Sequence, residues 1–236
     1  MSKIVVKYWG VRGSIPAPGK DTLRYGGNTS CVEITCGDQL FVIDAGTGIR
    51  DLGCSQAGTG EPLDIKLLFS HLHWDHIQGF PFYRPAFCEG NSIDIYSAHK
   101  ADVSLEAVLS GQMREPNFPV SLGALPAKLT YNEIAVGTPL IFDDVTVNTL
   151  VLDHPNQSMG IRLEYGGKSY IHISDHEARN DVSNLVEFSR GADVLAMDTM
   201  FTPGDYGSRE GWGHSTWKDG VELAKRAGIG ELILFH

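Results

Sequence analysis

The segment Ser70-His71-Leu72-His73-Trp74-Asp75-His76 places three histidines and an aspartate within six positions. Imidazole and carboxylate groups at this density are typical ligands of a borderline divalent cation such as zinc. His71 and His73 are two positions apart, so at the end of a strand they would point the same way. Asp75 and His76 then fall on a turn or a first helical turn, where they can face a second ion. A histidine-rich surface loop is the alternative, and the density of ligands argues against it.

Three further candidate ligands each follow an apolar strand pattern. They are His154 after 151–153, Asp175 after 171–174 and His236 after 232–235. Strand ends along one edge of a sheet are where ligands gather in α/β folds. A lone histidine at a strand end is more often structural, so each of these signals is weak by itself. Together with the histidine-rich segment, they supply enough ligands for a binuclear centre.

Four other polar residues receive no metal-binding role. Asp44 closes a strand pattern, and we interpret it as a turn carboxylate that bonds nearby backbone amides rather than as a ligand. His172 alternates with two isoleucines, so it faces the other side of its strand and is interpreted as structural. His99 is expected at the surface, and His176 is assigned no role.

The elements that must position these residues are mostly strands. Strand patterns cover residues 3–8, 31–36, 40–43, 65–69, 92–97, 128–134, 140–142, 145–152, 159–165, 169–173, 194–197 and 232–235. Helices are predicted over 100–113, over 182–189, and from a cap at Ser215 to about residue 227. Strands with interleaved helices predict an α/β fold with two sheets and helices outside, in a single domain over residues 1–236.

Composition narrows the function classes. The chain has 236 residues, 42% of them hydrophobic, and a formal net charge of −10. No apolar run reaches membrane-spanning length, and the N-terminus shows no secretory signal, so we expect a cytoplasmic protein without a membrane partner. The four cysteines are then expected to be reduced thiols. An acidic surface repels long polyanions, which counts against long nucleic acid but not against a small anionic substrate.

The ordered set His71-x-His73-x-Asp75-His76, His154, Asp175 and His236 resembles the metallo-β-lactamase superfamily over nearly the whole chain. The resemblance implies the αββα sandwich of that superfamily. It implies one metal held by His71, His73 and His154, and a second held by Asp75, His76 and His236, with Asp175 bridging. The cofactor expected is therefore two divalent ions, zinc in the first place, with manganese or iron as alternatives.

Three further segments narrow the resemblance to the phosphodiesterase branch. They are 9–14 (WGVRGS), 25–31 (YGGNTSC) and 211–216 (GWGHST). This branch includes ribonuclease Z, phosphoribosyl cyclic phosphodiesterase and bacterial cyclic-nucleotide phosphodiesterases. Relatives usually continue past the last ligand, whereas this sequence stops at His236. We expect either a missing tail or a terminal carboxylate close to the second metal.

Such a site supports hydrolysis. Two ions bridged by Asp175 can share one water, and a metal lowers the pKa of bound water from 15.7 to about 7. Asp75 is counted with the catalytic residues as well as with the ligands. The leaving oxygen also needs a proton, for which His214 is the candidate, because it precedes a predicted helix N-terminus that favours anions. Asp198, at the end of a strand pattern, could orient His214.

We therefore predict a binuclear metal-dependent phosphodiesterase for small substrates, with cyclic nucleotides first. One alternative is a ribonuclease Z-like endonuclease, although no basic arm that could hold transfer RNA is visible. A β-lactamase or lactonase, a di-iron redox protein and a non-catalytic nucleotide-binding protein are the others.

The aromatic segment 79–87 is either a loop packed on the core or a substrate wall with Phe80 and Phe82 as stacking faces. The irregular segment 116–126 is a lid or the contact of a homodimer.

Overall fold

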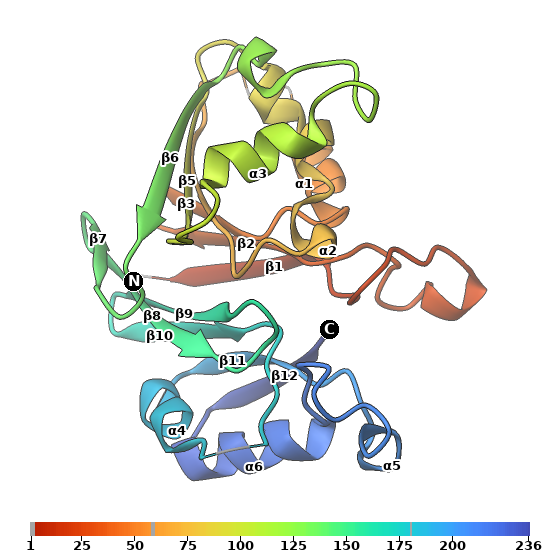
Figure 1. Ribbon diagram of the computed structural model, residues 1–236. Coiled ribbons are helices and arrows are strands. Elements are labelled where there is room, and N and C mark those ends of the chain that lie inside the picture. The colour runs from red at the N-terminus through yellow and green to blue at the C-terminus, as the bar shows by residue number, and fades with distance from the viewer. Residues whose placement is uncertain (1–2, 58–59, 180) are drawn as a thin grey trace. The chain divides into compact units, whose positions relative to one another are not determined.

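The computed structural model describes residues 3–57, 60–179 and 181–236. The chain divides into two compact units. One comprises Val5–Ala135, and the other comprises Val136–His236 together with Lys3 and Ile4. Each unit combines a sheet with helices (Figure 1), which confirms the expected α/β class. Within the described part of the chain, no helix is both long enough and apolar enough to span a membrane.

The sheet of the Val5–Ala135 unit contains six strands that follow the order of the chain. They are β1 (Ile4–Gly10), β2 (Cys31–Cys36), β3 (Gln39–Ile43), β4 (Asp64–Leu68), β5 (Ser92–Ala98) and β6 (Lys128–Ile134). β2 and β3 are antiparallel, whereas β3 to β6 run parallel. Parallel neighbours need crossover connections, which here contain α1 (Gly48–Gln56), α2 (Trp74–Ile77) and α3 (Leu105–Gln112).

The buried core of this unit explains why its strands and helices pack together. Ile65 and Leu67, two positions apart on β4, lie in one apolar cluster with Ile49 of α1 and Leu105 of α3. Burying one such side chain fully is worth about 1.5–3 kcal/mol. Four short 3-10 helices complete the unit: η1 (Lys20–Thr22), η2 (Phe80–Phe82), η3 (Arg84–Phe87) and η4 (Leu122–Ala124).

The second unit also has a six-stranded sheet, in the order β12-β11-β10-β9-β8-β7. Its strands are β7 (Leu140–Phe142), β8 (Val145–Leu152), β9 (Ser158–Tyr165), β10 (Lys168–Ile173), β11 (Val194–Asp198) and β12 (Glu231–Phe235). The helices are α4 (Ser183–Ser189), α5 (Pro203–Tyr206) and α6 (Trp217–Ala227). Leu185 of α4 and Leu223 of α6 join Ile171 and Leu195 of the sheet in a second apolar cluster.

The strand register of this sheet brings candidate functional residues to one edge. β10, β11 and β12 run parallel, with Ile173 opposite Met197 and Met197 opposite Leu234. Their carboxyl ends therefore lie side by side. Asp175, Asp198 and His236 follow directly at or just beyond these ends, as ligands in α/β folds do.

Most predicted elements are present, and the differences have local causes. The helix predicted over 100–113 begins only at Leu105, because the Ser104 hydroxyl caps it by accepting the N–H of Ala107. Helix α1 was not predicted, since two glycines interrupt its apolar pattern. The cap expected at Ser215 is one residue too early: Thr216 caps α6 instead. The cysteines, all within the described residues, form no disulfide, as expected.

Thr216→Ala should weaken α6. The Thr216 hydroxyl accepts the Asp219 N–H, and the Asp219 carboxylate accepts the Thr216 N–H at 2.9 Å. Two backbone N–H groups at the start of the helix, which have no partner within the helix, are thereby hydrogen-bonded. We expect a loss of about 1 kcal/mol in the free energy of unfolding, measured by urea denaturation. Thr216→Ser loses the same methyl group but keeps the hydroxyl, so it is the control. Equal stability of the two variants would mean that this cap contributes nothing.

Candidate metal centre

The histidine-rich segment folds as the sequence predicts. His73 is the N-cap of α2, so Asp75 and His76 occupy the first turn of that helix. The ring centroid of His71 lies 4.5 Å from that of His73 and 4.1 Å from that of His76. His76 Nε2 lies 3.3 Å from Asp75 Oδ2. Three imidazoles and one carboxylate thus converge in the Val5–Ala135 unit. His71, Asp75 and His76 are buried, and His73 is partly exposed.

Asp44 does more than the turn role that we expected. It is fully buried, in the left-handed region with φ 61°, directly after β3. It does accept a backbone N–H, from Ser70 at 2.8 Å, but its other oxygen lies 2.7 Å from His76 Nδ1. A carboxylate on Nδ1 fixes the proton there and leaves Nε2 as the nitrogen that can bind a metal. The sequence offered only one signal for this role, an aspartate at the end of a buried strand.

A backbone group positions the carboxylate of Asp75. The N–H of Ser14 donates to Asp75 Oδ2 at 2.7 Å. Ser14 belongs to the glycine- and proline-rich loop that follows β1, and its φ of 65° is left-handed. The main chain of this loop therefore helps to orient the candidate ligand Asp75.

The Val136–His236 unit gathers a second set of residues, with Asp175 at its centre. Asp175 Oδ2 lies 3.6 Å from His154 Nε2, and Oδ1 lies 3.2 Å from His236 Nε2. Each oxygen of this carboxylate thus faces a different histidine, which is the arrangement that a bridging ligand needs. Asp175 is only 3% exposed, so its charge is held away from water.

His154 is oriented by the backbone of Gly213. Its Nδ1 lies 2.9 Å from the Gly213 carbonyl oxygen and must donate to it, so Nε2 carries the lone pair that faces Asp175. Burial lowers the pKa of His154 below its ordinary value, although Asp175 and the Gly213 carbonyl act in the opposite direction. The neutral imidazole at neutral pH is the form that binds metals.

His214 and Asp198 are brought together as predicted. His214 Nδ1 lies 2.8 Å from Asp198 Oδ2, and Asp198 is fully buried. The ring of His214 also stacks on that of His236, with centroids 4.9 Å apart. Donor atoms of Asp198, His214 and His236 lie within 4.8 Å of one another, so these three residues are also a candidate ligand set.

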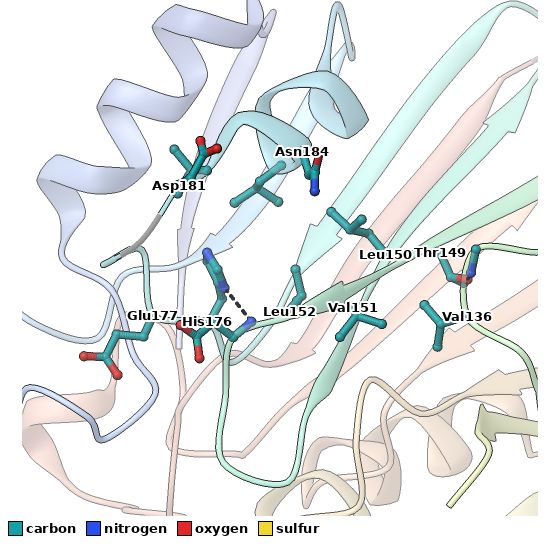
Figure 2. A pocket seen from close by; sticks show the side chains of 13 residues that line it. Val136, Thr149, Leu150, Val151, Leu152, His176, Glu177, Asp181 and Asn184 are labelled. Atoms are coloured by element: carbon teal, nitrogen blue, oxygen red, sulfur yellow. Dashed lines mark hydrogen bonds between the residues drawn. The ribbon is translucent and has the colours of Figure 1, made fainter.

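The two histidines that flank Asp175 have structural contacts. His172 is buried, and its Nδ1 lies 3.2 Å from the Tyr170 hydroxyl, in agreement with the structural interpretation. His176 Nδ1 accepts the N–H of Asp153 at 3.2 Å, the interaction dashed in Figure 2. Its ring lines a hollow of about 340 Å³, and burial lowers its pKa.

Glu177 was missed by the sequence analysis. Its carboxylate is 1% exposed and accepts the Tyr206 hydroxyl and the N–H groups of Gly211 and Gly213. Burial by itself would raise the pKa of Glu177, but these hydrogen bonds outweigh it and lower the pKa. The residue is therefore an anion that fixes the glycine-rich segment before His214. Its position two residues after Asp175 was the only available signal.

The aromatic segment after α2 is divided between the core and the surface of its unit. Phe80 is completely buried in the core of its unit, which agrees with the interpretation as a packed loop and contradicts the alternative of a stacking face. Phe82 is 57% exposed, and its ring meets that of Phe118 edge to face. Trp74, between two candidate ligands, is 79% exposed and offers a further aromatic surface.

The donors in both units fit divalent metals. Each set combines imidazole nitrogens with carboxylate oxygens, largely buried, which is the donor chemistry of zinc and of related first-row ions. His76, His154 and His214 each use Nδ1 for a hydrogen bond. This second bond holds the ring in place, as is usual for histidines that bind metals.

Comparison with known proteins agrees with this chemistry. A family model described as a β-lactamase superfamily domain matches residues 40–236. A ribonuclease Z from Bradyrhizobium sp. (strain ORS 278) is 24% identical over 257 residues, covering 86% of this chain and 81% of that protein. The probable metallo-hydrolase YhfI of Bacillus subtilis (strain 168) is 26% identical over 244 residues, covering 96% of this chain and 84% of YhfI.

Solved structures show the fold. The crystal structure of the metallo-β-lactamase fold protein YhfI from Bacillus subtilis matches with a TM-score of 0.72 at 23% identity, covering 99% of this chain and 85% of that chain. A diphosphatase of the PhnP family matches with a TM-score of 0.72 at 17% identity, covering 100% of this chain and 87% of that chain. The fold expected from the sequence is thereby confirmed. Because the family model matches most of its length, this chain belongs to the β-lactamase superfamily.

Proposed function

We propose that this protein is a binuclear metal-dependent hydrolase of small phosphodiesters, with cyclic nucleotides as the first candidates. The observation that carries the proposal is the carboxylate of Asp175, whose two oxygens face His154 and His236 separately. A carboxylate that served a single ion would not need a histidine beside each oxygen. The similarity to a probable metallo-hydrolase and to a ribonuclease Z supports hydrolysis as the reaction class.

The proposal keeps the ligand assignment that the family resemblance implies. One ion would be held by His71, His73 and His154, and the other by Asp75, His76 and His236, with Asp175 shared between them. Zinc is the first candidate because the set is rich in imidazole, and manganese and iron suit the same donors. When bound, such ions lower the pKa of a coordinated water and stabilise negative charge on phosphoryl oxygens.

The protein itself would supply the proton for the leaving oxygen. His214 directs Nδ1 to Asp198, so Nε2 is the nitrogen from which it can deliver a proton. Asp198 also accepts the N–H of His176 at 3.1 Å and that of Met200 at 3.1 Å. A carboxylate held at several points keeps the imidazole from turning. General acid catalysis of this kind is typically worth about 10²–10⁴-fold.

A ribonuclease Z-like activity is the second candidate, and one specific observation favours it. A relative similar over 86% of this chain is a ribonuclease Z, so RNA is not excluded as a substrate. The net charge of −10 opposes it, because binding a long polyanion depends on positive charge. A homodimer and a cytoplasmic location also remain predictions.

A substrate panel tests the proposed reaction. Cyclic nucleotides, a bis-nitrophenyl phosphodiester, precursor transfer RNA and a β-lactam would be given to protein of measured metal content. We expect turnover of the small phosphodiesters and little or none of the β-lactam. Efficient β-lactam hydrolysis without any phosphodiester turnover would contradict the proposal. Turnover of precursor RNA alone would favour the second candidate.

Asp175→Ala should disrupt both metal sites. After reconstitution we expect two divalent ions per wild-type chain and at most one in the variant, because the bridging carboxylate serves each ion. Elemental analysis measures the stoichiometry, and Asp144→Ala, at an exposed turn, is the control. A wild-type stoichiometry that saturates at one ion would remove the second site from the proposal.

His214→Ala should depress kcat selectively. When the ring of a cyclic nucleotide opens, the ribose oxygen leaves as an alkoxide and needs a proton, whereas a nitrophenolate leaving group is stable without one. We expect a loss of about 10²–10⁴-fold for the cyclic nucleotide and little change for the nitrophenyl ester. Asp198→Asn should also lower kcat more for the cyclic nucleotide than for the nitrophenyl ester, but by a smaller factor.

The matched control is His99→Ala, since His99 is exposed and bonds Glu133. Metal content is measured for every variant, because His214 also belongs to a candidate ligand set. Equal losses on both substrates with metals retained would refute the acid role. Loss of metal in His214→Ala would make His214 a ligand instead.

A further inference from the structure

Gly213 is held through both of its backbone groups. Its N–H donates to Glu177 Oε2 at 2.9 Å, and its carbonyl oxygen lies 2.9 Å from His154 Nδ1. A single residue thus connects a buried carboxylate to a candidate metal ligand. The next residue in the chain is His214, the candidate general acid.

Only glycine fits at this position. The backbone of Gly213 is left-handed, with φ 88°, which L-residues rarely adopt. A Cβ atom there would lie 2.3 Å from His154 Nδ1 and 2.4 Å from Cδ of Pro155. The imidazole of His154 therefore packs directly on the same backbone whose carbonyl oxygen accepts its hydrogen bond. Any displacement of this backbone must be transmitted to the His154 ring.

Glu177 is the group that fixes this backbone from the other side. Besides Gly213, it accepts the N–H of Gly211 at 2.7 Å and the hydroxyl of Tyr206 at 2.7 Å. The N–H of Glu177 donates to the Asp153 carbonyl at 2.8 Å, which ties it to the residue before His154. Figure 2 shows the Glu177 carboxylate next to His176 but directed away from the apolar side chains of the hollow.

We propose that Glu177 is a positioning residue that sets His154 for metal binding and His214 for proton transfer. It does so by clamping the 206–213 segment through three hydrogen bonds to one buried carboxylate. Hydrogen bonds to a charged acceptor are about twice as strong as neutral ones, so a carboxylate suits this task better than an amide. The His214 part of this inference rests on the proposed function, whereas the His154 part requires only metal binding.

Glu177→Gln is the decisive variant. Glutamine keeps the shape but turns one acceptor oxygen into an NH₂ group, which would face a donor of the clamped segment. Zinc affinity is measured by competition with a chromophoric chelator, without any substrate. We expect it to fall by about 10–100-fold, the usual effect of losing a partner that orients a metal ligand. The ratio of kcat for a cyclic nucleotide to kcat for a nitrophenyl ester should fall as well, because His214 loses its position.

The control is Glu187→Gln, the same chemical change at an exposed glutamate that pairs with Arg190. Its zinc affinity and kcat ratio should equal those of the wild type. Unchanged values in Glu177→Gln, with metal bound normally, would overturn the proposal. A lower stability without either change would mean that Glu177 supports the fold alone.

Tyr206→Phe covers the case in which Glu177→Gln does not fold. It removes one of the three hydrogen bonds and leaves the carboxylate in place. A smaller shift of zinc affinity in the same direction supports the clamp, and no shift overturns it. If the wild type hydrolyses no phosphodiester, the proposed function fails. A weakened zinc affinity in Glu177→Gln would still support the positioning of His154.

Discussion

Buried negative charge is the constraint on which the candidate site depends. Asp44 and Asp198 are fully buried, and Asp175 is 3% exposed. Removing an ionised carboxylate from water costs several kcal/mol unless hydrogen bonds and opposite charges compensate. The partners of these carboxylates include imidazoles, hydroxyls and backbone N–H groups. A bound divalent cation would add opposite charge beside Asp175, so the burial that is costly for this carboxylate would favour metal binding.

Hydrogen bonds to buried acceptors fix the orientation of the histidine rings in the candidate site. His76 and His214 each use Nδ1 for a hydrogen bond with an aspartate, Asp44 and Asp198 respectively. His154 uses Nδ1 for a hydrogen bond with a backbone carbonyl. Each ring is thereby fixed in one tautomer, and its second nitrogen is aimed elsewhere. The acceptor differs from case to case, but the result is a set of rings whose orientation is determined before any ligand arrives. Such preorganisation is what distinguishes a site from a collection of histidines.

The sequence indicated the candidate ligands more readily than the residues that orient them. The spacing of His71, His73 and Asp75 and the strand-end position of Asp175 reflect local geometry, which a short window of sequence contains. Asp44 and Glu177 act through hydrogen bonds to residues 32 and 36 positions away, so no local pattern indicates them. The burial of Phe80 beside an exposed Phe82 depends on a short 3-10 turn, for which neither the helical nor the strand period applies.

The Ser14–Asp75 contact has a consequence for how this site can be explored by mutation. Because the donor is the main-chain N–H, replacing the serine side chain leaves the hydrogen bond intact, and alanine scanning would pass over the position. Only a change to the backbone itself, such as Ser14→Pro, which deletes the donor, or a one-residue deletion that shifts the loop, would expose its role. Residue 14 also lies outside residues 40–236, so an alignment restricted to the family domain would omit it. The loop can therefore orient a candidate metal ligand even though substitutions of its side chains would not reveal this role.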